Sequence, residues 1–97
     1  MAPRTHKREI EAIRRYVSLV GGVCNVLHQA GRLRGSAGIP DLYLQFPRAR
    51  RSLWLEVKVG RDKLSPAQKA FLQREEDCGG VVIVGGLEEV ELWWNQG

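Results

Sequence analysis

The 97-residue sequence predicts an α/β fold, a mixed sheet flanked by helices in the order helix, three strands, helix, strand. Three observations predict it. Apolar residues recur at helical spacing near the N-terminus, two neighbouring central segments alternate between apolar and polar residues, and a β-branched run follows a clearly capped second helix. A chain of this length suits one domain, so we expect residues 1–97 to form a single domain.

The first predicted element is a helix over residues 6–19. The apolar residues that recur at helical spacing there are Ile10, Ile13, Val17 and Val20. Thr5 is placed to cap the helix, and Gly21-Gly22 ends it. A strand is expected at residues 22–27. Residues 31–40, which contain glycines, two arginines and a proline, are expected to form a loop.

Two alternating segments predict an antiparallel hairpin with strands at 41–46 and 53–59 and a turn at 47–51. In the first strand, Leu42, Leu44 and Phe46 share one face and Asp41, Tyr43 and Gln45 share the other. In the second strand, Leu53, Leu55, Val57 and Val59 point one way and Trp54, Glu56 and Lys58 point the other.

The remaining elements are a helix, a strand and a short tail. After a loop at 60–64, Ser65-Pro66-Ala67-Gln68 is a strong helix start with a capping box, and Gly79-Gly80 stops that helix. The run 81–84 is expected to be a strand buried on both faces. Residues 87–94 are expected to form a short terminal helix, with an edge strand at 90–93 as the alternative.

The polar residues of the hairpin carry the candidate chemistry. Glu56 and Lys58 project from the same face about 6.5–7 Å apart, and Asp41 begins the neighbouring strand. A Glu-x-Lys on a strand is most often a weak surface pair. If the register brings Asp41 to Glu56, however, the two carboxylates repel unless a cation lies between them. A hard ion such as Mg²⁺ would fit there and would activate water, and Lys58 could orient that water or neutralise phosphate charge.

Three ordered motifs carry a family resemblance: Gly38-Ile39-Pro40-Asp41-Leu42, then Trp54-Leu55-Glu56-Val57-Lys58, then Leu64-Ser65-Pro66-Ala67-Gln68. Together they resemble the VRR-NUC family, the virus-type replication-repair nuclease domains of the PD-(D/E)xK superfamily. The resemblance implies a restriction-endonuclease-like αβββαβ core.

The same resemblance implies Mg²⁺- or Mn²⁺-dependent phosphodiester hydrolysis. It implies that Asp41, Glu56 and the backbone carbonyl of Val57 hold the metal and that Lys58 is the catalytic lysine. Free-standing members of this size, often encoded by phages, resemble Holliday-junction resolvases. We therefore expect a structure-selective endodeoxyribonuclease that cuts branched DNA, such as four-way junctions, as a homodimer. The alternatives are a nicking, flap or restriction-type nuclease, and a catalytically silent DNA-binding module.

Two site residues have competing interpretations. Gln68 either completes the capping box by reaching back to Ser65 or, as the resemblance implies, faces the active site. The resemblance also places an acid of the first helix near the metal. Glu9 lies near the edge of the apolar face and is preferred to Glu11, which points nearly opposite, while His6 could replace or assist the acid.

The chain carries a formal charge of +4, which weakly suggests an anionic partner such as nucleic acid. The candidate phosphate contacts lie in glycine-bearing loops and in the hairpin turn. They are Arg32, Arg34, Arg48, Arg50, Arg51 and Lys63, with Arg61 beside them.

The other large or reactive residues leave alternatives open. Tyr43 and Trp54 either line the cleft or pack under the first helix, and Trp93 and Trp94 are candidates for core or dimer packing. The two cysteines lie in no CxxC pair, no signal peptide precedes them, and no apolar run is long enough for a membrane helix. We therefore expect reduced thiols in a cytoplasmic protein of a bacterium or a phage-infected host.

Overall fold

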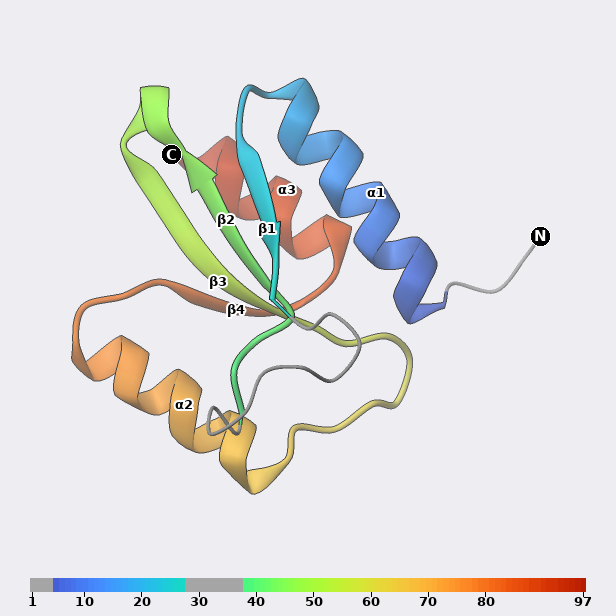
Figure 1. The fold of residues 1–97 in the computed structure, drawn as a ribbon, viewed down its shortest axis with the longest axis vertical. Helices are drawn as coiled ribbons and strands as arrows, with labels where there is room; N and C mark the ends of the chain where they lie inside the picture. The colour runs from blue at the N-terminus through green and yellow to red at the C-terminus, as the bar shows by residue number, and fades with distance from the viewer. Residues whose placement is uncertain (1–4, 28–37) are drawn as a thin grey trace.

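The computed structural model describes residues 5–27 and 38–97 (Figure 1). The helices are α1 His6–Leu19, α2 Pro66–Asp77 and α3 Leu87–Gln96, with a short 3-10 helix, η1, at Pro47–Ala49. The strands are β1 Val23–Val26, β2 Leu42–Phe46, β3 Arg51–Val57 and β4 Val82–Gly85. The predicted αβββαβ order is confirmed, and α3 forms the tail.

The four strands form one mixed sheet in the order β1-β2-β3-β4. β1 pairs with β2 and β2 with β3 in antiparallel fashion, whereas β4 runs parallel to β3. In the β2–β3 hairpin, Leu42 pairs with Leu55 and Tyr43 with Trp54. Continuing this register by one residue places Asp41 opposite Glu56.

Local sequence signals set the helix bounds. The Thr5 side chain accepts the Arg8 N–H at 3.2 Å, so the predicted cap of α1 is confirmed. Ser65 and Gln68 form the full capping box at the start of α2. Within residues 5–27 and 38–97, no helix is long and apolar enough to span a bilayer.

The apolar core lies between the sheet and the pair α1 and α3, which Figure 1 shows together on one side of the sheet. Its buried members come from the alternating apolar positions of the hairpin and from the inner faces of the two helices. They are Ile13, Val17, Leu42, Leu44, Phe46, Leu53, Leu55, Val57 and Val90. The predicted apolar faces are therefore confirmed over both strands of the hairpin.

The opposite face of the sheet carries an aromatic cluster under α2. The Tyr43 and Trp54 ring centroids are 4.5 Å apart, and Phe71 of α2 lies 5.3 Å from Trp54. The Trp54 indole N–H donates to Glu75 Oε1 at 2.8 Å. Packing of Trp54 under the first helix is therefore wrong, because its position in β3 directs it to the face that α2 covers.

Two strand predictions need correction. The expectation that 81–84 is buried on both faces is wrong, because β4 ends the sheet and leaves Val81 41% and Val84 40% exposed. β3 begins at Arg51 and ends at Val57 rather than spanning 53–59. Arg51 already pairs with Phe46, the ladder with β2 ends at the Leu42–Leu55 pair, and the ladder with β4 ends at the Val57–Gly85 pair.

The terminal helix is confirmed, and the edge-strand alternative is wrong. α3 packs its tryptophans on the core, with Trp93 and Trp94 ring centroids 5.5 and 4.6 Å from that of Phe46. Of the two roles considered for these residues, the structure therefore shows core packing.

Candidate active site

The loop before β2 packs closely against the start of α2. Gly38 has φ +84°, and a Cβ atom there would overlap the Ala67 carbonyl and lie 2.9 Å from the Gln68 nitrogen. A residue with a side chain therefore does not fit, which explains the glycine of the G-x-P-D motif. This close approach fixes the path of the chain three residues before Asp41.

Asp41 is fixed by the backbone of the neighbouring strands. Its Oδ2 accepts the Val57 N–H at 2.9 Å, and its backbone carbonyl accepts the Leu27 N–H at 2.9 Å. The carboxylate is therefore held at the end of β3, beside Glu56, rather than turned into solvent.

Glu56 is a buried acid with only 3% of its surface exposed. Its Oε2 lies 3.3 Å from the Lys58 Nζ and accepts a hydrogen bond from the Gln68 Nε2 at 3.2 Å. Its Oε1 is buried and has no hydrogen-bond partner among the described residues. A buried carboxylate oxygen without a partner is costly, so this atom points to a ligand that the protein itself does not supply.

The electrostatics of the site centre on this carboxyl. Burial raises the pKa of Glu56 to about 7, and the charge of the neighbouring Asp41 and its side-chain contact act in the same direction. Lys58 opposes the shift in pKa by favouring the ionised form. Two acids and one amine leave a net negative charge when all are ionised, which favours binding of a cation.

These residues fit a hard divalent ion. Within residues 5–27 and 38–97, no three histidine, cysteine, aspartate or glutamate side chains converge as a complete metal site. Mg²⁺ does not need such a set, because one or two carboxylates bind it together with waters and substrate phosphate. Asp41 and the unpartnered Glu56 Oε1 match that donor chemistry.

A family model described as the VRR-NUC domain matches residues 7–86. The chain belongs to the VRR-NUC family. A solved structure described as a VRR_NUC domain is similar to it over 84% of this chain and 83% of that one, with 28% sequence identity and a TM-score of 0.68. No curated protein matches the chain. VRR-NUC domains are nuclease domains, so the resemblance drawn from the three motifs is confirmed, together with a nuclease-type function and DNA as the substrate class.

In this VRR-NUC domain, Gln68 makes both of the contacts that the sequence left as alternatives. Its Oε1 accepts the Ser65 N–H at 2.8 Å, and its Nε2 donates to Glu56. The two interpretations do not compete, because the amide presents an acceptor and a donor at opposite edges.

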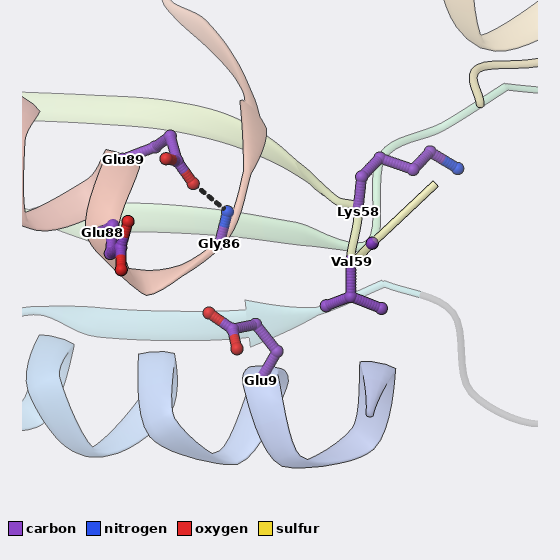
Figure 2. Close-up of a pocket in the computed structure, with 7 residues that line it drawn as sticks. Glu9, Lys58, Val59, Gly86, Glu88 and Glu89 are labelled. Carbon is purple, nitrogen blue, oxygen red and sulfur yellow. Dashed lines mark hydrogen bonds between the residues drawn. The ribbon is translucent and has the colours of Figure 1, made fainter. Parts of the chain in front are cut away.

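Glu9 lies on the side of the sheet away from α2. It is 2% exposed, and its Oε2 accepts the Leu87 N–H at 2.7 Å, at the first residue of α3. It lines a pocket of about 160 Å³ that Lys58 also lines (Figure 2). The structure does not bring Glu9 into a three-carboxylate cluster with Asp41 and Glu56. Its catalytic role stays a prediction, while its contact with α3 is structural.

His6 is the α1 side chain that reaches the acids. Its Nε2 lies 3.3 Å from Asp41 Oδ2, and the side chain is 47% exposed. The helical wheel favoured Glu9, but a wheel gives only the direction of a side chain and not the residues that it meets.

The predicted phosphate contacts are not gathered at the acids. Arg48 and Arg50 are exposed at the hairpin turn, which lies at the opposite end of β2 and β3 from Asp41. Arg51 stacks 3.7 Å over the Trp93 ring and donates to the carbonyls that end α3, so it has a structural role. Lys63 is exposed in the loop that leads from Lys58 to α2. Arg32 and Arg34 lie outside the described residues.

Two cations that were not predicted as site residues from the sequence, Lys7 and Arg14, lie near Asp41. They line a hollow beside α1 that Asp41 also lines. The available signal was their spacing of seven residues, which places both on one side of a helix.

Proposed function

We propose that this protein is a Mg²⁺- or Mn²⁺-dependent endodeoxyribonuclease that cuts branched DNA, with the four-way junction as its principal substrate and a homodimer as its active form. Membership of the VRR-NUC family supports the nuclease activity. The observation that carries the chemistry is the meeting of Asp41 and Glu56 where β2 begins and β3 ends, with the Lys58 ammonium 3.3 Å from Glu56.

Asp41, Glu56 and the backbone carbonyl of Val57 would hold the metal ion. When bound, such an ion polarises the scissile phosphate and lowers the pKa of a bound water. Lys58 would orient the attacking water and stabilise the negative charge that develops on the phosphate. Gln68 would keep the Glu56 carboxylate in position by donating to its Oε2.

Symmetry supports the proposed substrate and assembly. A two-fold homodimer suits a four-way junction, which offers two equivalent strands to cut. A silent DNA-binding module is disfavoured, because converging acids beside DNA phosphates would repel them unless a metal ion bridges the two. A nicking or flap nuclease would use the same acids and differ only in how DNA reaches them.

A plasmid-nicking assay with Mg²⁺, with Mn²⁺ and with a chelator tests the activity. We expect cutting only with the metals, and metal-independent cutting would refute the mechanism. A panel of end-labelled four-way junctions, flaps, nicked duplexes and linear duplexes, mapped at nucleotide resolution, tests the substrate. We expect symmetric cuts in the four-way junction. Preferred cutting of flaps would show that flaps, and not four-way junctions, are the principal substrate. Solution mass measurement with and without junction DNA tests the homodimer.

A further inference from the structure

Two neighbouring hollows lie along the exposed side of α1, and one of them reaches Asp41. One hollow, of about 320 Å³, is lined by His6, Lys7, Ile10, Arg14, Val26 and Asp41, among others. A second, of about 390 Å³, is lined by Glu11, Arg14, Arg15 and Ser18. Arg14 and Glu11 line both hollows, so the two lie side by side, and we call them together the α1 groove.

The lysine and arginines of the α1 groove outnumber its acids, Glu11 and Asp41. Lys7, Arg14 and Arg15 are all exposed, and none forms an ion pair within residues 5–27 and 38–97. Lys7 and Arg14 are two helical turns apart, which separates them by about 10 Å along α1 on nearly the same side. Cations on one side of a helix can each contact a phosphate of one nucleic-acid strand.

One of the cations, Arg14, also lies close to β1, which forms the other side of the groove. Burial raises the pKa of the Cys24 thiol on β1, and the charge of Arg14 opposes that rise, so the guanidinium lies close to this strand. Ile10 and Val26 give the floor an apolar surface between the charges. Apolar patches between cations suit the sugars and bases of a DNA strand, whose phosphates need the charges.

The groove ends at the candidate active site. Asp41 lines the first hollow and also contacts the Val57 N–H beside Glu56. A strand lying in the first hollow would therefore reach Asp41. The turn that carries Arg48 and Arg50 is separated from Asp41 by the length of β2, about 15 Å.

We propose that the α1 groove binds the sugar-phosphate backbone of the DNA strand next to the scissile phosphate, with Lys7 and Arg14 as the main phosphate contacts. The proposal rests on the proposed function, because it takes Asp41 to mark the position of cutting. It assigns substrate binding to α1 rather than to the hairpin turn.

The test compares two double variants that each remove two positive charges, Lys7→Ala/Arg14→Ala and Arg48→Ala/Arg50→Ala. Binding of a labelled four-way junction is measured across a salt series without divalent ions, and cutting is measured separately with Mg²⁺. We expect the α1 variant to lower the slope of log K against log salt by about 1.4–1.8, which is two contacts at about 0.7–0.9 each. Its KM should rise while kcat changes little, and the turn variant should match the parent protein.

An unchanged salt slope in the α1 variant, or a larger loss in the turn variant, would overturn the proposal. Thermal melting checks folding, and Lys7→Gln/Arg14→Gln replaces the alanine pair if that pair melts early. If the parent protein never cuts DNA but the α1 variant loses DNA binding, the groove assignment stands and the proposed nuclease activity is refuted. If the α1 variant binds DNA normally and cuts it with metal, the nuclease activity stands and the groove assignment is refuted.

Discussion

The side-chain nitrogen of Gln68 lies 3.2 Å from Oε2 of Glu56, while the oxygen of the same amide accepts the Ser65 N–H at 2.8 Å. The first turn of α2 is therefore connected directly to the buried acid of β3. Glutamate would cap the helix equally well but could not donate to Glu56 unless protonated.

Gln68→Glu should therefore separate the two roles of this residue. The variant keeps the capping box but removes the donor to Glu56 and adds a negative charge, so we expect cutting to fall by at least about tenfold. Gln68→Ala should also lose about 1 kcal/mol of unfolding free energy, because one half of the box is gone. Nicking rates at pH 8, where Glu56 is largely ionised, and urea unfolding at pH 6, where it is largely neutral, measure the two effects.

Full activity of Gln68→Glu would reduce Gln68 to a helix cap. Equal stability of the Ala and Glu variants would instead show that the box contributes little to α2.

Glu56→Gln should stabilise the metal-free protein at alkaline pH. The pKa of Glu56 rises from 4.5 to about 7 on folding, so the folded state holds an extra proton between these values. The unfolding free energy of the parent protein should therefore fall as the pH rises through this window. The variant lacks this loss and should gain up to about 3 kcal/mol over the parent at pH 8.

Urea unfolding at pH 4, 5, 6, 7 and 8 in a chelating buffer measures this difference. Glu76→Gln, at an exposed position on α2, is the matched control and should show no such gain. A parent protein whose stability rises between pH 5 and 7, with no gain in Glu56→Gln, would contradict the buried-acid description.

Several parts of the fold could be predicted because their causes are local. The caps Thr5 and Ser65 act within one turn, so α1 and α2 begin where their sequences indicate. Alternation in the hairpin separated the buried apolar face from the face that carries Glu56. The register is less obvious, since Arg50 closes the turn with φ 53°, a conformation that glycine or asparagine usually signals.

The remaining features depend on partners that sequence spacing does not reveal. Nothing in the run 81–84 shows that β4 has a neighbouring strand on one side only. Glu9 was identified as a first-helix acid, but its contact with Leu87 joins residues 78 positions apart. Arg51 is an arginine beside a basic turn, which suggests a phosphate contact, but its side chain instead binds the end of α3.

Asp41→Asn should weaken Mn²⁺ binding by at least about tenfold. The asparagine can still accept the Val57 N–H, so the fold is kept while one negative charge is lost. Two unit charges about 4 Å apart near a protein surface attract each other by a few kcal/mol. A tenfold loss of affinity is therefore a lower bound on the expected effect. In the parent protein, Mn²⁺ affinity should rise from pH 6 to pH 8, because Glu56 must lose its proton to bind.

Isothermal calorimetry measures these affinities. Asp62→Asn is the matched control, because Asp62 also accepts a backbone N–H, that of Val59, but lies exposed in the following loop. Unchanged Mn²⁺ affinity in Asp41→Asn would reject Asp41 as a ligand.

Lys58→Ala should lower the rate of cutting by about 10²–10³-fold, the usual cost of removing one group that stabilises transition-state charge. Junction binding should change little, because only one positive charge is lost and Lys58 is largely buried against Glu56. Single-turnover cleavage and gel-shift titrations separate the two quantities. Lys63→Ala removes an exposed lysine from the same loop region and should cut at close to the parent rate. Undiminished cleavage by Lys58→Ala would remove this lysine from the mechanism.

Arg51→Ala should destabilise the protein without weakening its binding to DNA. The guanidinium stacks 3.7 Å over Trp93 and donates to the Trp93 and Trp94 carbonyls at 2.9 and 3.2 Å, where the negative end of the α3 dipole lies. Losing the stacking and both bonds should cost about 2–3 kcal/mol of unfolding free energy. Arg50→Ala removes the neighbouring charge without these contacts and should leave stability nearly unchanged. If Arg51→Ala instead kept its stability and lowered the salt slope of DNA binding by about 0.9, Arg51 would be a phosphate contact after all.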